Sequence, residues 1–126
     1  MKWRSAVAAA MAMAALAPLA AGAAAAQEVN EGGGAVLRGL DKINASVGTL
    51  DLPSGGTTEF GGLTIRLNEC RYPVDDPAGD AFAFVTISDR DSDETLFSGW
   101  MIASSPALNA LEHPRYDIWV LRCKTE

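Results

Sequence analysis

Residues that could support hydrolysis lie close together near the end of the chain. Ser104, Ser105, His113 and Asp117 supply the side-chain types of a serine hydrolase triad. The Gly-x-Ser-x-Gly turn that exposes the nucleophile of many hydrolases is missing around both serines. A serine just before Pro106 is also typical of a helix N-cap. We therefore rank a small hydrolase, or an inhibitor of one, as the least favoured function and assign no catalytic residue.

Carboxylates in an acidic loop could bind a cation. Asp75, Asp76 and Asp80 lie within ten residues that also contain two prolines and a glycine. Carboxylate oxygens are ligands that calcium prefers, so a loose calcium site stays open as an alternative. The other interpretation is a solvated turn. No other cofactor is indicated.

Cys70 and Cys123 are the only cysteines, and they lie 53 residues apart. An even cysteine count in an exported chain favours a structural disulfide. Strict alternation along the strand that starts at Leu63 would place Cys70 on the polar face. Either a bulge near Asn68 and Glu69 reverses the facing of the strand, or the disulfide lies at a sheet edge. The sequence leaves both arrangements open.

The first 26 residues are typical of a secretory signal peptide. A short basic stretch precedes an apolar, alanine-rich segment that ends in small residues before Gln27. We expect cleavage after Ala26, with Ala23 as an alternative site. An uncleaved membrane anchor is the competing interpretation. Cleavage predicts a periplasmic protein that is not inserted in the membrane.

The expected mature chain, residues 27–126, is strongly acidic. Cleavage would remove Lys2 and Arg4, two of the ten basic residues, and none of the sixteen acidic ones, which leaves a net charge of −8. Nucleic-acid binding depends on a basic surface, so we expect no nucleic-acid partner. An envelope protein or a cell-wall component is the expected partner.

Alternating apolar residues and turn signals predict an all-β domain over residues 35–126, after a flexible lead-in over 27–34. Six or seven short antiparallel strands would form a small sandwich or a partly open barrel. One short helix, over residues 106–112, would dock Leu108 and Leu111 on the sheet before the last strand. The predicted strands begin with 35–43 and 46–53, continue with a hairpin of 57–60 and 63–67 and a second hairpin of 81–88 and 95–103, and end with 116–123.

The partner surface is expected where large amphipathic side chains gather. Trp100 and Tyr116 are the best anchors, because tryptophan and tyrosine dominate binding hot spots. His113 and Arg115 are adjacent to Tyr116 in the sequence and complete the candidate surface.

Two stretches carry a resemblance to a known family. CRYPVDDPAGDAFAFVTISD and LFSGWMIASSPALNALEHPRYDIWVLRC resemble the DUF2155 family of exported α-proteobacterial proteins, and AVLRGLDKI is similar in style. The resemblance covers roughly residues 35–124. It implies an envelope setting and a compact domain, and it brings no activity, substrate or catalytic residue.

These observations favour a non-catalytic periplasmic accessory or binding domain that acts on an envelope protein or complex. The alternative is a module that binds a small ligand or a cell-wall carbohydrate. An exposed row of aromatic side chains would favour the alternative, whereas a flat apolar patch would favour the first function.

Overall fold

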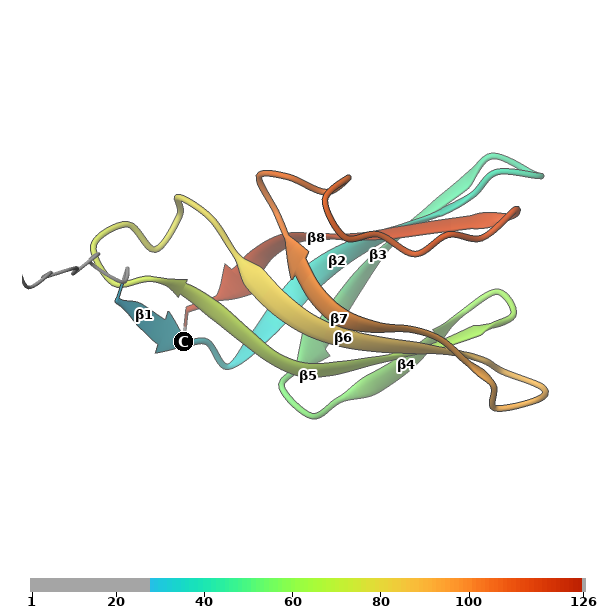
Figure 1. Cartoon of the computed structure of the whole chain (residues 1–126), viewed down its shortest axis with the longest axis horizontal. Helices are drawn as coiled ribbons and strands as arrows, with labels where there is room; N and C mark the ends of the chain where they lie inside the picture. The colour runs from blue at the N-terminus through green and yellow to red at the C-terminus, as the bar shows by residue number, and fades with distance from the viewer. Residues whose placement is uncertain (1–27, 126) are drawn as a thin grey trace, which may run out of the picture.

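The structure is a computed structural model that describes residues 28–125 (Figure 1). The predicted signal peptide lies outside these residues. Eight antiparallel strands form two sheets, and the described residues contain neither a helix nor a closed barrel, so the all-β class is confirmed. The strands are β1 (Val29–Glu31), β2 (Gly34–Asp41), β3 (Ser46–Pro53), β4 (Thr57–Phe60), β5 (Leu63–Pro73), β6 (Phe82–Asp89), β7 (Thr95–Ile102) and β8 (Tyr116–Lys124).

The larger sheet, called sheet A, has the order β1-β5-β6-β7, and β4 also pairs with β5. Strand β1 pairs with residues 71–73 of β5 and β4 pairs with residues 63–66, so the two lie end to end along one edge of β5. The smaller sheet, sheet B, has the order β3-β2-β8. The two sheets form the two layers visible in Figure 1.

The core lies between the sheets and is built from alternate residues of each strand. In β5, Leu63, Ile65 and Leu67 are at most 1% exposed, and in sheet B Leu37 and Val120 are at most 2% exposed. Period-two alternation places these side chains on one face of each strand. Truncating such a residue to alanine typically costs about 2–5 kcal/mol, so this apolar layer is the main source of stability.

Two β-bulges bring the cysteines into this core. In β5, Leu67 pairs with Val85 and Glu69 pairs with Phe84, so Asn68 is an extra residue. The extra residue reverses the facing of the strand, and Cys70 points inward with 0% exposure. The bulge that the sequence raised as one of two alternatives is therefore present.

A second bulge precedes the other cysteine. Val36 pairs with Arg122 and Leu37 pairs with Val120, so Leu121 is the extra residue in β8. Cys123 consequently shares the inward face with Val120 and is 5% exposed. Both sulfurs therefore meet inside the molecule.

The disulfide joins the two sheets. Cys70 on β5 and Cys123 on β8 have Cα atoms 5.6 Å apart and are bonded, as the sequence predicts. The chain between β1 and β2 crosses from one sheet to the other at this point, where the Gly32 N–H donates to the Cys70 carbonyl and the Gly33 N–H donates to the Lys124 carbonyl. A Cβ on Gly32 would collide with the Lys124 carbonyl, so this crossing requires glycine.

Aromatic packing joins the sheets at the other end of the molecule. The ring of Phe60 lies against Gly39 and Gly48, which are cross-strand partners in sheet B and leave room for it. Tyr116 packs edge-on against Phe60, with ring centroids 5.9 Å apart. The Tyr116 hydroxyl also accepts a hydrogen bond from the Gly62 N–H in the β4–β5 turn. Sheets A and B are thus held together at both ends.

The predicted helix over residues 106–112 is wrong. The segment forms turns, in which the Ser105 N–H donates to Ile102 and the Leu108 N–H donates to Ser105. Leu111 is buried as expected, but Leu108 is 74% exposed. Seven residues between two prolines are too few to form a stable helix without strong packing. Side-chain hydrogen bonds of Ser104 with Asp80 and of Asn109 with the Trp100 carbonyl fix the segment in a different shape.

The predicted flexible lead-in, residues 27–34, contains structured residues. Strand β1 lies within it, and β2 already begins at Gly34. Three polar or exposed residues form β1, so no apolar alternation marks it in the sequence. The strand is held by backbone pairing with the end of β5, which only the tertiary structure provides. With β1, the described residues contain eight strands, compared with the six or seven that the sequence predicts.

Candidate functional site

The outer face of sheet A carries a row of aromatic side chains. Cross-strand partners in an antiparallel pair point to the same face of a sheet. Phe84 is the partner of Trp100, and the buried pair Ala83 and Met101 occupies the opposite face. Phe82 is the partner of Arg71 on one side and of Ile102 on the other. These side chains therefore face away from the core, and Phe82, Phe84 and Trp100 are half-buried.

The members of this row contact one another closely. Phe84 and Trp100 pack edge-on, with ring centroids 5.3 Å apart and an interplanar angle of 85°. The Arg71 guanidinium lies over the Trp100 ring at 5.2 Å from its centroid, a cation–π contact. Arg71 also forms an ion pair with Glu69 at 3.0 Å. The row therefore combines large apolar rings with a fixed positive charge.

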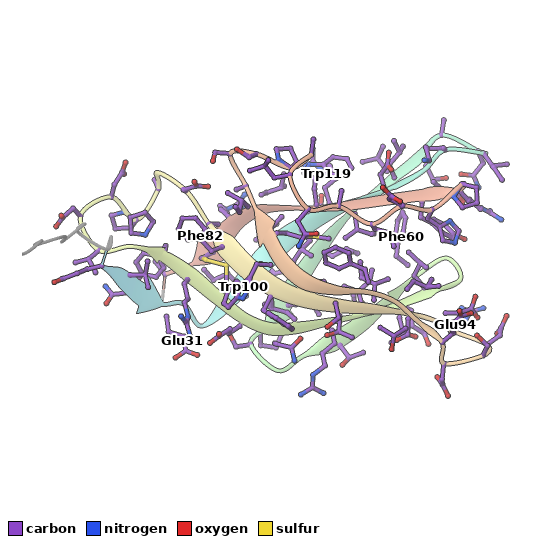
Figure 2. The ribbon with its side chains drawn as sticks, in the orientation of Figure 1. Glu31, Phe60, Phe82, Glu94, Trp100 and Trp119 are labelled. Atoms are coloured by element: carbon purple, nitrogen blue, oxygen red, sulfur yellow. A yellow bond between two sulfur atoms is a disulfide. The ribbon has the colours of Figure 1, made fainter. Side chains whose placement is uncertain are left out.

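A shallow hollow of about 270 Å³ lies within this surface. Its lining consists of Val29, Arg71, Phe82 and Trp100, which belong to strands β1, β5, β6 and β7. Val29 is 38% exposed. Figure 2 shows Phe82 and Trp100 on this part of sheet A. We call Val29, Arg71, Phe82, Phe84 and Trp100 the aromatic patch.

The four residues of the predicted partner surface are separated. Trp100 belongs to the aromatic patch, whereas Tyr116 is 6% exposed and lies between the sheets. His113 is half-buried, and its Nδ1 accepts hydrogen bonds from the backbone N–H groups of Arg115 and Tyr116. The structure thus gives His113 and Tyr116 positions in the packing around the start of β8, away from the aromatic patch.

Arg115 is engaged in the same region. Its guanidinium donates to both carboxylate oxygens of Asp41, at 2.8–3.1 Å, and lies over the Tyr116 ring at 5.2 Å from its centroid. Asp41 is the buried acidic residue at the end of β2, with 6% exposure. The hydrogen bonds from Arg115 hold the pKa of Asp41 below its ordinary value, with further lowering by the Ile43 N–H. This bidentate pair fixes the start of β8 against β2.

The aspartates of the alternative calcium site do not converge within residues 28–125. Asp80 accepts hydrogen bonds from the Ser104 hydroxyl at 2.7 Å and from the Ser104 and Ala81 N–H groups. Within residues 28–125 no group of three His, Cys, Asp or Glu side chains is placed to hold a metal ion. Asp75 and Asp76 lie in the exposed loop after β5. Asp80 acts in the structure as an anchor for the segment that follows β7.

The residues of the hypothetical hydrolase triad are occupied by other contacts. The Ser104 hydroxyl donates to Asp80, and the side chain of Asp117 lies 3.4 Å from Lys42. His113 Nδ1 accepts hydrogen bonds from the backbone N–H groups of Arg115 and Tyr116. The structure gives none of these residues the mutual hydrogen bonds of a triad.

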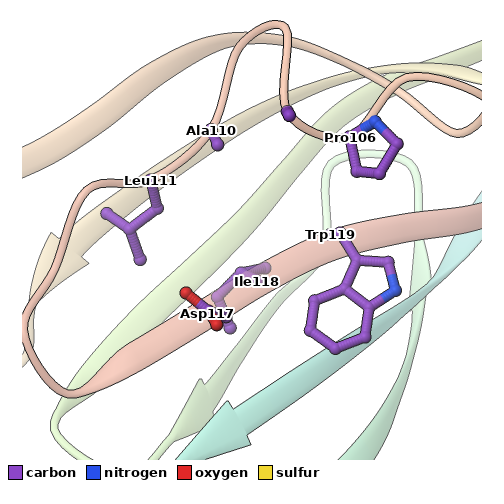
Figure 3. Close-up of a pocket in the computed structure, with 7 residues that line it drawn as sticks. Pro106, Ala110, Leu111, Asp117, Ile118 and Trp119 are labelled. Atoms are coloured by element: carbon purple, nitrogen blue, oxygen red, sulfur yellow. The ribbon is translucent and has the colours of Figure 1, made fainter. Parts of the chain in front are cut away.

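A second hollow, of about 300 Å³, lies along β8 (Figure 3). Pro106, Ala107, Ala110 and Leu111 line one wall and belong to the segment between β7 and β8, whereas the other wall is residues 117–119 of β8. The lining is largely apolar. We call this hollow the β8 groove.

The sequence identified Trp100 but missed its neighbours in the aromatic patch. Residues 81–88 are apolar on both faces, a pattern that indicates a strand buried on both sides. This pattern predicts that Phe82 and Phe84 lie in the core, whereas both face outward. Arg71 is the signal that could have shown the correct facing. A charged residue faces outward, and its cross-strand partner Phe82 must then face outward too, once the register of β5 and β6 is known.

Comparison with known proteins identifies relatives without an assigned activity. An uncharacterized protein of Rickettsia prowazekii (strain Madrid E) is 36% identical over 87 residues. Those residues are 67% of this chain and 56% of the relative, so the chain spans little more than half of the relative's length. No solved structure matches the chain.

In the part of the chain that the structure describes, no helix is long and apolar enough to cross a membrane. The model of a family described as an uncharacterized protein conserved in bacteria matches residues 35–123, which include both cysteines and most of the aromatic patch. The chain therefore belongs to the DUF2155 family.

Proposed function

We propose that the protein is a non-catalytic binding domain of the periplasm, and that its aromatic patch docks on an envelope protein or complex. The observation that carries the proposal is the outward-facing row of Phe82, Phe84 and Trp100 on a rigid sheet. Tryptophan and arginine are enriched at the centres of protein interfaces, where a few large side chains supply most of the binding energy. The patch offers both, already in contact with each other.

The geometry of the rings supports a protein partner over a carbohydrate. Stacking on a sugar requires the open face of an aromatic ring. Arg71 covers one face of Trp100, and Phe84 meets Trp100 edge-on, so the two rings do not present one flat platform. An irregular apolar surface with a central charge is better complemented by protein side chains.

Export of the protein is part of the same proposal. The amino-terminal residues are typical of a cleaved signal peptide, and a disulfide inside the fold is compatible with an oxidising compartment. An intact-mass measurement of the exported protein would test cleavage, and a mass that still includes residues 1–26 would refute it.

The binding role is tested by purifying tagged protein from the native envelope after mild crosslinking. Trp100→Ala removes the centre of the aromatic patch. Val47→Ala is the control, because it truncates an exposed apolar side chain on β3 of sheet B that lines neither the aromatic patch nor the β8 groove. Both variants are first checked for unchanged thermal unfolding.

We expect one stoichiometric partner with the wild-type protein and with Val47→Ala, and loss of that partner with Trp100→Ala. Equal recovery with Trp100→Ala would refute the aromatic patch as the docking surface. Binding of cell-wall fragments that depends on Trp100 would instead establish the carbohydrate function.

A further inference from the structure

We propose that the β8 groove is a second binding site, which takes an extended peptide segment of another protein as an added strand beside β8. The site is separate from the aromatic patch and does not depend on its function. Strand addition uses the unpaired edge of a sheet for backbone hydrogen bonds and adjacent pockets for side chains. Both features are present at the β8 groove.

The groove lies at the edge of β8 and not on one of its faces. Successive side chains of a strand point to opposite faces, yet Asp117, Ile118 and Trp119 all line the groove. A hollow that runs along the edge of a strand is adjacent to consecutive residues in this way, and β8 is an edge strand of sheet B. The other edge of these residues is paired with residues 38–40 of β2, so the edge at the groove is the outer edge of sheet B.

This outer edge carries backbone groups that need partners. Every second residue of a strand directs its N–H and C=O groups to one edge. In the described part of the chain, the backbone hydrogen bonds of the facing segment go to Ile102, Ala81 and Ser105, and none goes to residues 117–119. An open row of alternating donors and acceptors is complementary to one kind of occupant, an extended backbone.

The opposite wall of the groove is held in place from both ends. Asp80 binds Ser104 at its start, and the Asn109 side chain donates to the Trp100 carbonyl in its middle. Toward its end, the Lys42 side chain donates to the His113 carbonyl. Anchors in the loop before β6, on β7 and in the β2–β3 turn keep the segment at a distance from β8, so the groove is preformed. A preformed site lowers the entropic cost of binding.

The groove also specifies the side chains of its occupant. Its length along β8 is three residues, or about 10 Å at the rise of a strand. Ala107, Ala110, Leu111 and Ile118 provide an apolar surface for one inward-pointing side chain. The Asp117 carboxylate on the wall is paired with Lys42 at 3.4 Å, but the chain as a whole is acidic, with a net charge of −6. We therefore specify the occupant as an extended segment that places an apolar residue in the groove and carries a net positive charge.

The probe is a heptapeptide library displayed on phage and selected against the full mature protein. Ala110→Trp fills the groove, and Ala110 is exposed, so the fold tolerates the change. Leu108→Trp is the matched control, because Leu108 is 74% exposed on the same segment and does not line the groove. Enriched peptides are then synthesised with and without methylation of the central backbone nitrogens and titrated by NMR.

We expect apolar peptides with a basic residue to bind the wild-type protein and Leu108→Trp, with amide shifts centred on residues 117–119. Ala110→Trp and backbone methylation should each weaken binding at least about tenfold, the equivalent of one or two lost hydrogen bonds. Three results would overturn the proposal. The first is that the selection enriches no peptides on the wild-type protein beyond those it enriches on Ala110→Trp. The second is that the backbone-methylated peptides bind as tightly as the unmethylated ones. The third is a concentration-dependent dimer that Ala110→Trp abolishes, which would assign the groove to a second copy of the chain.

Discussion

Asn68 and Leu121 occupy equivalent places in the two strands that the disulfide joins: each is the extra residue of a β-bulge, and each lies two residues before a cysteine. Without these bulges, strict alternation would turn Cys70 away from Leu67 and Cys123 away from Val120. The two local irregularities therefore allow an inter-sheet disulfide in a domain whose strands are otherwise regular.

Deleting Asn68 should preserve the disulfide. The remaining pairs, Leu67 with Val85 and Glu69 with Phe84, then form an uninterrupted ladder with Cys70 still pointing inward. We expect a loss of about 1 kcal/mol, from the exposed hydrogen bond that Asn68 accepts from Thr86 and from altered local twist. Urea unfolding and thiol counting without reductant measure both quantities.

Deletion of Arg66 is the control for this experiment. It removes an exposed residue from the same strand but turns Leu67 outward and Asn68 inward, which should cost several kcal/mol (about 3 or more) through lost apolar burial. Equal stability of the two deletions, or free thiols after deletion of Asn68, would contradict the bulge account.

Removing the disulfide should destabilise the protein strongly. Replacing both cysteines by alanine releases a 53-residue loop, for which the chain-entropy relation gives a loss of about 4 kcal/mol. Urea unfolding of the double variant and the wild-type protein measures the difference. A change below about 1 kcal/mol would show that the core and the Phe60 and Tyr116 contacts hold the sheets together without it.

The hydroxyl of Tyr116 should contribute to stability and not to binding. Tyr116→Phe leaves the Gly62 N–H without its acceptor, and we expect a loss of about 1 kcal/mol in unfolding free energy. Tyr72→Phe is the matched control, because the Tyr72 hydroxyl makes no hydrogen bond within residues 28–125 and the ring is similarly buried. If both variants lost the same stability, the hydrogen bond would have no specific role.

The Asp41 and Arg115 pair should make stability sensitive to acid. Hydrogen bonds from Arg115 place the folded pKa of Asp41 below the ordinary carboxyl value. A lowered folded pKa means that the stabilisation is complete at neutral pH and is lost as the pH falls below about 4. The difference in melting temperature between wild type and Asp41→Asn should therefore be largest near pH 7 and shrink below about pH 4.

Asp89 titrates in the same range, because the N–H groups of Ser92 and Asp91 also lower its pKa. Asp89 is present in both proteins, so its effect cancels in the comparison of wild type with Asp41→Asn. A melting-temperature difference that stays constant from pH 7 to pH 3 would contradict the assignment of this acid sensitivity to Asp41.

The sequence predicts most strands of the domain because their pattern is local. Alternation along residues 63–67 and the Gly61-Gly62 turn specify the β4–β5 hairpin, and Gly61 indeed has a positive φ of 59°. The helix prediction is wrong because tertiary contacts fix the segment: Ser104 donates to Asp80 in the loop before β6, and Asn109 donates to the Trp100 carbonyl on β7. Strand β1 was missed because only pairing with β5 defines it.

The aromatic patch was harder to predict than the fold. Alternation shows that Phe82 and Phe84 share a face, but both faces of β6 are apolar, so the sequence does not show which one is exposed. The facing depends on Asn68, because the bulge shifts the register that pairs Arg71 with Phe82. Tyr116 is an amphipathic side chain, which suits a binding surface as well as a core. Its hydroxyl can be buried here because it accepts a hydrogen bond from the Gly62 N–H, and this contact is not visible in the sequence.

Docking through the aromatic patch is tested with a photo-crosslinking amino acid at position 84, in the patch, and at position 47, where Val47 is 61% exposed on sheet B. After irradiation in the native envelope, mass spectrometry identifies any attached protein. The account predicts one discrete partner crosslinked from position 84 and none from position 47. A partner captured from position 47 alone, or no adduct from position 84, would contradict it.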